Sequence, residues 1–545
     1  MIKGALIFFI TLNLIGCNIK TEHSDTARIY FDKKNSTSYA GNYLTANYSI
    51  MKGDAYTASR ILEKNSSNLK LLEIKFFSNL IGGNFVTADK VSQKLKVNGK
   101  NDTLYDFPRY ILKIKSNDIK GGLKVFKNQK LFFNLDNLNN LIKFWIKESE
   151  NTKKYLSEKH YINSSIHELL ILENFYNSSE LLQIADIIYK KGKLNSHELL
   201  LLAGFYFRVD NFEKSKEIIN TKLPSQFDKM KIINNFSKEN NIFKKIQKLN
   251  FILASKIYGL TIQNNPTINK SNSYRKILLE FSIFLEPKMD ISKYDLANIY
   301  NLEKTYKLAF RILDTIPEKS FFSLSANLKK LDVKKSSGAD VEYKTLLFKI
   351  IKLWPDNKFA LYRIANYYKS KAQYQKSLKI YKKILDKSDS NDHDLFLYAS
   401  NLDKVGEWEK AKVLFLQLLK QNPKDTFTLN YISYKLALKN QELELALKLI
   451  KEALALDPDN GYFLDTLGWV EYKRSNFNSA VYFLERSVSI LPRSAEVIDH
   501  LGDCYFMLNR EREAFFEWNK ALKYEKDKSI IRKIKEKISK HEHLL

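Results

Sequence analysis

The chain has 545 residues and a net charge of +28, from 89 Lys and Arg against 61 Asp and Glu. Apolar residues make up 44% of it, which is enough for a packed core and excludes disorder as the state of the whole chain. With 17 Gly and 9 Pro, the composition argues against a β-sandwich or barrel with many tight turns and favours long helices.

The positive charge is spread over the whole length rather than gathered in one segment. Most of it comes from Lys, and Asn and Ile are also abundant, as in proteins of AT-rich genomes. This pattern predicts a solvated, Lys-rich surface and no nucleic-acid site. Near an anionic membrane the same charge would add a weak attraction.

Residues 1–17 have the order of an export signal. Lys3 precedes an apolar run from Ala5 to Ile15, which leads into Leu14-Ile15-Gly16-Cys17. The alternative is an uncleaved membrane anchor, but the run is shorter than the roughly 20 residues of a transmembrane helix. The four residues resemble the lipobox of bacterial lipoproteins, in which the chain is cleaved before the cysteine and the cysteine is acylated.

That resemblance implies an exported chain anchored through lipid on Cys17. Asn18 stands where Asp commonly signals retention in the inner membrane of gram-negative bacteria. The expected location is therefore the periplasmic face of the outer membrane. With Cys17 lipidated, Cys504 has no partner for an intramolecular disulfide.

Residues 18–37 are polar and aperiodic and are predicted to form a flexible tether. Residues 38–289 keep a helical periodicity with recurring small residues, such as Ala46, Gly53 and Ala58. We expect divergent helical hairpins there. An enzyme would have to be hidden in residues 100–290, and a deep polar pocket in that segment would reveal it.

Residues 290–526 contain a clear repeat. Pro355, Pro423, Pro458 and Pro492 are separated by 68, 35 and 34 residues, and 68 is twice 34. The last three prolines are each preceded, twelve residues earlier, by a small residue: Ala411, Ala446 and Ala480. A period of 34 with these fixed positions is typical of a helical solenoid. Residues 527–545 are charged and periodic and predict a polar capping helix.

The unit from Gly461 to Pro492 shows how each repeat would pack. Gly468 has no side chain, so a second helix can approach the first, with Leu484 filling the space between them. These residues resemble the tetratricopeptide repeat (TPR) consensus, which implies an all-α fold, an α-solenoid of TPR helical hairpins. The Phe427–Pro458 unit has one extra residue, which predicts a bulged turn between its two helices.

No sequence pattern in the chain predicts catalysis. It has no phosphate-binding loop, dinucleotide turn or nucleophile elbow. His167-Glu168 and His197-Glu198 begin like zinc-protease motifs but lack the second His, so we interpret them as ordinary helix-surface residues. Cys504 is expected to be a small buried residue. We predict a chain that is not an enzyme and needs no cofactor or metal.

The TPR resemblance implies a concave groove lined by the first helix of each unit. The groove residues carried over from the consensus are Tyr462, Asp465, Trp469, Tyr472 and Lys473, followed by Glu496, Asp499, Asp503, Phe506 and Met507. Aromatic and acidic residues together suit a protein partner with apolar anchors and some positive charge. The basic clamp with which some TPR proteins bind a carboxyl terminus does not map onto Phe359, Tyr362 and Asn366.

The expected function is that of a non-catalytic, membrane-anchored periplasmic scaffold. The chain resembles a class of TPR lipoproteins in its lipobox, its repeats and its charged C-terminal end. Members of that class serve as adaptors of carboxyl-terminal-processing proteases and bring them cell-wall enzymes. The alternative is an assembly factor for outer-membrane protein insertion or polysaccharide export. TPR solenoids often dimerise through edge repeats, so a homodimer stays open.

Overall fold

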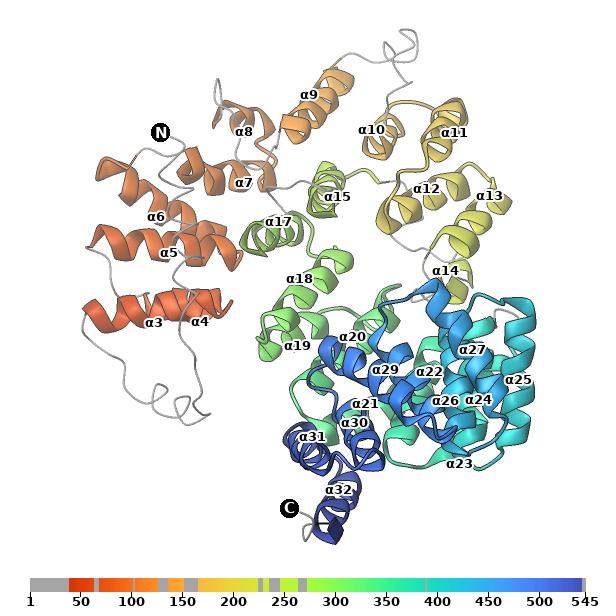
Figure 1. Cartoon of the computed structure of the whole chain (residues 1–545). Coiled ribbons are helices and arrows are strands. Elements are labelled where there is room, and N and C mark those ends of the chain that lie inside the picture. The colour runs from red at the N-terminus through yellow and green to blue at the C-terminus, as the bar shows by residue number, and fades with distance from the viewer. Residues whose placement is uncertain are drawn as a thin grey trace. The chain divides into compact units, whose positions relative to one another are not determined.

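The structure, a computed structural model, consists of helices joined by short turns. The residues that it describes are 39–62, 68–100, 103–125, 136–150, 165–223, 229–234, 246–262, 272–387 and 390–541. These residues contain no strand, and the prediction of an all-α solenoid is confirmed (Figure 1). The signal segment 1–17 with Cys17 and the tether 18–37 lie outside the described residues. The chain divides into two compact units, Met1–Pro355 and Asp356–Leu545.

The N-terminal unit is a series of mostly antiparallel helix pairs around one large core, with a smaller separate hydrophobic cluster among its first three helices. Its helices are α3 (Tyr39–Met51), α4 (Ala55–Ile61), α5 (Leu69–Ile81), α6 (Phe85–Val97), α7 (Phe107–Lys115), α8 (Ile119–Val125), α9 (Asp136–Glu150), α10 (Ile166–Leu172), α11 (Leu182–Lys191), α12 (Ser196–Arg208), α13 (Phe212–Glu217), α14 (Lys229–Asn234), α15 (Leu249–Ile262), α17 (Asn272–Leu285), α18 (Asp290–Leu302), α19 (Tyr306–Asp314), α20 (Ser323–Ser336) and α21 (Asp340–Leu353). The core includes Phe281 of α17, whose ring lies 6.3 Å from Phe85 and 5.6 Å from Phe107. Helices far apart in the sequence therefore share one hydrophobic interior.

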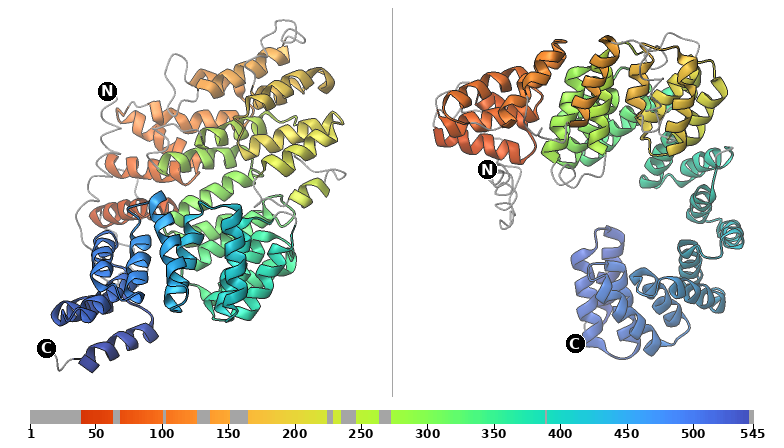
Figure 2. Two further views of the ribbon diagram at one scale, coloured as in Figure 1. Left: turned by 45° about the vertical axis from the view of Figure 1, so that its right-hand side comes forward. Right: turned by 90° about the horizontal axis from the view of Figure 1, so that it is seen from above.

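The C-terminal unit is a regular stack of helix pairs (Figure 2). Its helices are α22 (Lys358–Ser370), α23 (Tyr374–Leu385), α24 (Asp392–Lys404), α25 (Trp408–Gln421), α26 (Thr426–Leu438), α27 (Leu443–Leu456), α28 (Gly461–Lys473), α29 (Phe477–Ile490), α30 (Ala495–Met507), α31 (Glu511–Tyr524) and α32 (Lys528–His541). Each even-numbered helix from α22 to α30 is the first helix of a pair. First helices contact one another, α26 with α28 and α28 with α30, whereas contacts among second helices are weaker. The closer packing places the first helices on the inner side of the curve.

From α18 onward, the turn inside each pair contains a residue with positive φ at the same place. These residues are Lys304, Gly338, Ala372, Gly406, Asn440, Ser475 and Asn509. They are 34 residues apart at every step except one of 35, so the period begins at α18 in the N-terminal unit. In the Ser475 turn, the N–H groups of Ser475 and Asn476 donate to the carbonyls of Tyr472 and Glu471 at 2.9 Å, which ends the first helix.

The extra residue of the Phe427–Pro458 unit lies in its inter-helix turn, as predicted. Asn440 and Glu442 both have positive φ there, at 54° and 43°. The turn has four residues between α26 and α27, against three between α28 and α29. The insertion is thus absorbed in the turn, and both flanking helices keep their length.

The link between pairs is set by proline. The residues before Pro423, Pro458 and Pro492 have φ between −143° and −116°, outside the helical region, because the proline ring disfavours helix in the residue before it. Each second helix therefore ends there, and a polar residue soon caps the next helix. In α28, for example, the Asn460 side chain accepts from the N–H groups of Tyr462 and Phe463.

Small residues let the two helices of a pair approach, as predicted for Gly468. A Cβ atom on Gly468 would lie 2.6 Å from Cγ of Leu484, and one on Gly502 would lie 2.5 Å from Cδ1 of Trp518. In the pair of α22 and α23, the small residue is Ser377, whose hydroxyl Oγ donates a hydrogen bond to the Ala365 carbonyl at 3.0 Å. The distance between the two helices of a pair therefore depends on small residues at these positions.

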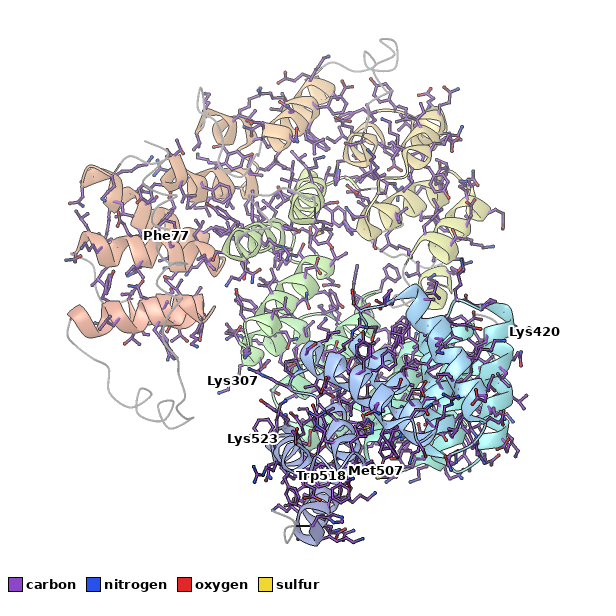
Figure 3. The ribbon with its side chains drawn as sticks, viewed as in Figure 1. Phe77, Lys307, Lys420, Met507, Trp518 and Lys523 are labelled. Atoms are coloured by element: carbon purple, nitrogen blue, oxygen red, sulfur yellow. The ribbon has the colours of Figure 1, made fainter. Side chains whose placement is uncertain are left out.

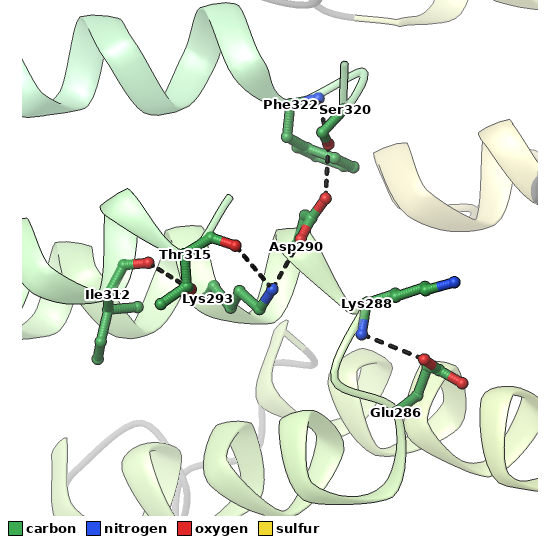
Figure 4. Close-up of polar contacts among 8 residues, drawn as sticks. All are labelled: Glu286, Lys288, Asp290, Lys293, Ile312, Thr315, Ser320 and Phe322. Atoms are coloured by element: carbon green, nitrogen blue, oxygen red, sulfur yellow. Dashed lines mark hydrogen bonds and ion pairs between the residues drawn. The ribbon is translucent and has the colours of Figure 1, made fainter. Parts of the chain in front are cut away.

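Polar contacts tie α18 to the segment that leads into α20 (Figure 4). Asp290 accepts from Lys293 Nζ at 3.0 Å and from Ser320 Oγ at 2.6 Å. Lys293 Nζ also lies 3.4 Å from the Thr315 carbonyl and is largely buried. The network fixes the start of α18 against the following pair.

Within the described residues, no helix has both the length and the apolar character needed to cross a membrane.

Candidate functional site

The residues predicted for the groove lie on α28 and α30, on the inner side formed by the first helices of the C-terminal unit. We call the surface of α22, α24, α26, α28 and α30 that carries these repeat positions the first-helix face. Most of its predicted residues belong to three groups: an exposed aromatic at the start of α28, a stacked cluster in its middle, and acidic residues on α30 that contact α32.

Tyr462 is 60% exposed in the first turn of α28. The corresponding residue of the preceding repeat is Phe427, in the first turn of α26, and its side chain is 75% exposed. Phe427 was not among the predicted groove residues, although it precedes Tyr462 by 35 residues, the spacing of Pro423 and Pro458. Two aromatic side chains at equivalent positions of contacting helices therefore face solvent.

The middle of α28 is packed against α30. The Trp469 ring stacks on Tyr472 at 4.7 Å and on His500 at 4.0 Å between centroids. His500 Nδ1 lies 2.9 Å from Asp465 Oδ1, and both side chains are 8% exposed. Burial favours the neutral imidazole, but the contact with Asp465 outweighs it and raises the pKa of His500. Asp465 and Trp469 thus hold two repeats together.

The acidic residues of α30 contact the last helix. Lys537 of α32 lies 2.8 Å from Asp499 Oδ1 and 2.7 Å from Asp503 Oδ1. Asp503 also accepts from Trp518 Nε1 at 2.9 Å. Burial and the neighbouring Asp503 raise the pKa of Asp499, which explains why a cation is needed between the two. Lys537 therefore neutralises a pair of carboxylates that would otherwise repel each other.

The remaining predicted residues line the edges of the first-helix face. Glu496 accepts a hydrogen bond from the Tyr434 hydroxyl. The Phe506 ring lies 5.6 Å from Trp518 and 4.3 Å from His541. Met507 is 44% exposed (Figure 3), and Lys473 Nζ stands 4.8 Å from the centre of the Trp469 ring. Burial, followed by the charge of Asp503, raises the pKa of Tyr472 to about 12.

The interpretation of His167 and His197 as surface residues was wrong. His167 is fully buried and His197 is 3% exposed. The glutamates that follow them are capping residues: Glu168 bonds the Ser165 N–H, and Glu198 bonds the Asn195 N–H. The capping boxes fix where α10 and α12 begin and so turn each histidine toward the core.

Neither histidine belongs to a metal site in the part of the chain that the structure describes, where no group of three or more His, Cys, Asp or Glu residues could hold a metal ion. His167 Nε2 lies 3.1 Å from Ser255 Oγ, while both ring nitrogens of His197 are buried without a hydrogen-bond partner. Cys504 is fully buried, as predicted, and burial raises the pKa of its thiol. Its sulfur therefore stays protonated and unreactive.

Acid should weaken the packing of α12. Burial holds the pKa of His197 at about 4, against 6.5 in an unfolded chain. As pH falls from 7.5 to 4.5, the unfolded segment binds a proton at His197 that the folded segment does not bind, so about 2–3 kcal/mol of stability is lost. Hydrogen exchange of α12 amides at the two pH values measures this loss.

Burial lowers the pKa of His167 in the neighbouring helix α10 as well. His197→Phe keeps a ring and removes one of the two titrations, so it should reduce the pH dependence, and adding His167→Phe should remove most of the rest. His393→Phe, at an exposed position of α24, is the matched control and should preserve it. An α12 equally protected at both pH values in the wild-type chain would contradict this account.

Known proteins resemble parts of the chain. No family model matches it. A TPR repeat-containing protein of Methanocaldococcus jannaschii is 29% identical over 156 residues, which are 28% of this chain and 26% of that protein. A TPR repeat-containing protein of Pseudomonas aeruginosa is 25% identical over 181 residues, 33% and 30% of the two chains. The chain is thus similar over about a third of its length to proteins that contain TPR repeats.

Further matches have lower sequence identity. The mitochondrial import receptor subunit TOM70 of Mus musculus is 24% identical over 139 residues, 26% of this chain and 23% of that protein. The crystal structure of yeast Tom70 is 12% identical with a TM-score of 0.35, covering 93% of this chain and 96% of that one. The chain thus matches about a quarter to a third of the length of its curated TPR relatives, and the similarity concerns the repeats.

Proposed function

We propose that this TPR-type chain is a non-catalytic scaffold that binds partner proteins on the first-helix face of its C-terminal unit. The observation that carries the proposal is the exposure of Phe427 and Tyr462, at 75% and 60%, on contacting helices. Exposed aromatic side chains that neighbour one another are typical of protein-binding surfaces. TPR-type relatives support a role in protein–protein interaction.

We further propose that Cys17 carries lipid and anchors this scaffold at the periplasmic face of the outer membrane. The support is the lipobox-like sequence Leu14-Ile15-Gly16-Cys17. A tethered scaffold raises the effective concentration of two partners and so needs no catalytic group. Bringing cell-wall enzymes to a processing protease would be one such use.

The experiment is affinity capture with the full chain from its own cell envelope, followed by binding measurements with the purified captured partner. Phe427→Ala combined with Tyr462→Ala should weaken that binding at least about tenfold, since aromatic anchors commonly contribute more than 1 kcal/mol. The control combines Tyr482→Ala and Phe516→Ala. These aromatics of the second helices α29 and α31 are 58% and 66% exposed. Equal binding by both variants would overturn the proposal.

A further inference from the structure

The charge of the partner can be inferred from the first-helix face, on the condition that the proposed function holds. Every carboxylate at the repeat positions of this face has a partner within the chain. Asp465 pairs with His500, Asp499 and Asp503 share Lys537, and Asp403 lies 2.7 Å from Lys435 Nζ. The fifth, Glu496, accepts from the Tyr434 hydroxyl. The acidic residues therefore attract an incoming cation only weakly.

The lysines at the corresponding positions are different. Three of them lie in the last turn of a first helix: Lys369 in α22, Lys404 in α24 and Lys473 in α28. No carboxylate pairs with any of these three in the part of the chain that the structure describes. Burial, and then the charge of Lys404, lower the pKa of Lys369, so the two ammonium groups lie close enough to repel. The uncompensated charge of the face is positive.

These cations and the exposed aromatics occupy different parts of the face. Lys369 and Lys404 lie at the ends of α22 and α24, whereas Phe427 and Tyr462 lie at the beginnings of α26 and α28. Start and end of such a helix are about 16 Å apart, since eleven residues rise about 1.5 Å each. A bound segment that contacts both the lysines and the aromatic side chains therefore crosses the face diagonally. It needs at least about five extended residues to do so.

We propose that the first-helix face binds an acidic peptide segment of a partner protein. Its carboxylates lie against Lys369 and Lys404, and an apolar side chain at least about five residues away packs on Phe427 and Tyr462. Two uncompensated lysines favour a partner with at least two carboxylates. The acidic residues of α28 and α30 would by themselves suggest a basic partner. His500 and Lys537 already form ion pairs with three of them, Asp465, Asp499 and Asp503.

The test is selection from a displayed library of random twelve-residue peptides on the full chain. The selected peptides should be enriched at least tenfold, relative to the starting library, in pairs of Asp or Glu. An aromatic or large aliphatic residue should stand at least about five residues before or after each pair. Lys369→Glu combined with Lys404→Glu should abolish that enrichment. The matched control, Lys420→Glu combined with Lys448→Glu, reverses the same charge on the exposed side of α25 and α27 and should preserve it.

The other outcomes separate the two proposals. Peptides that depend on Phe427 and Tyr462 but are basic or without charge bias would overturn the acidic-segment inference and keep the scaffold proposal. Peptides that ignore both the lysine and the aromatic variants, or a library from which nothing is selected, would count against both. A single-stranded RNA dodecamer that displaces acidic peptides at lower concentration would also overturn the inference, because the face would then bind polyanions in general.

Discussion

Replacing Trp518 with alanine should lower the free energy of opening of the last repeat by about 3–5 kcal/mol. Trp518 is 2% exposed and fills the space above Gly502, with its Nε1 bonded to Asp503. Its removal leaves a cavity between α30 and α31 and also removes a donor from Asp503, which already shares Lys537 with Asp499. Hydrogen exchange of the α30 and α31 amides in the full chain measures the effect.

Phe516→Ala is the control for this prediction. Phe516 lies two residues earlier on the same helix, and its side chain is 66% exposed. Its removal should change the opening free energy by less than about 0.5 kcal/mol. Equal losses in the two variants would show that α31 does not pack as the structure describes.

Arg208→Met should strongly destabilise the N-terminal unit. Arg208 holds Glu173 through two bonds, Nε to Oε1 at 2.5 Å and a terminal nitrogen to Oε2 at 2.8 Å. The Glu173 side chain is 1% exposed, so without Arg208 a charge stays buried and unpaired. Such losses cost about 3–5 kcal/mol. Urea unfolding of the full chain followed by circular dichroism measures the shift.

The double variant separates this mechanism from simple loss of packing. Adding Glu173→Leu to Arg208→Met removes the unpaired charge, so most of the lost stability should return. Breaking the exposed Lys120–Glu150 pair by Glu150→Ala should leave the unfolding curve unchanged. A double variant as unstable as Arg208→Met alone would contradict the explanation.

Much of the fold could be predicted from the sequence because its determinants are local. Prolines at a spacing of 34 or 35 and the small residues Gly468 and Ala480 act within one repeat, and the structure follows them. The left-handed turn residues extend the same period to Lys304 of the N-terminal unit. Lys304 lies inside the predicted repeat region 290–526, but the turn residues themselves form no sequence pattern, because left-handed backbone is carried by residues as different as Lys304, Ala372 and Ser475.

The chemistry of the candidate site was harder to predict because it depends on contacts between repeats. Asp499 and Asp503 are neutralised by a lysine more than 30 residues later, in a helix outside the last repeat. Asp465 is neutralised by His500 from the neighbouring repeat. Likewise, only the capping role of Glu168 and Glu198 explains why the histidines beside them are buried. The repeat pattern of the sequence therefore predicted which face carries these side chains, but it did not predict which residues form ion pairs with them.

The central claim, that partners bind on the first-helix face, is tested most directly by photo-crosslinking in the producing cells. A benzophenone amino acid is placed at position 427 or 462 of the full chain, and at 482 or 516 as the control on the second helices. The account predicts a discrete crosslinked partner from positions 427 and 462 and none of the same mass from 482 and 516. The same partner captured from 482 and 516, with nothing from 427 and 462, would contradict it.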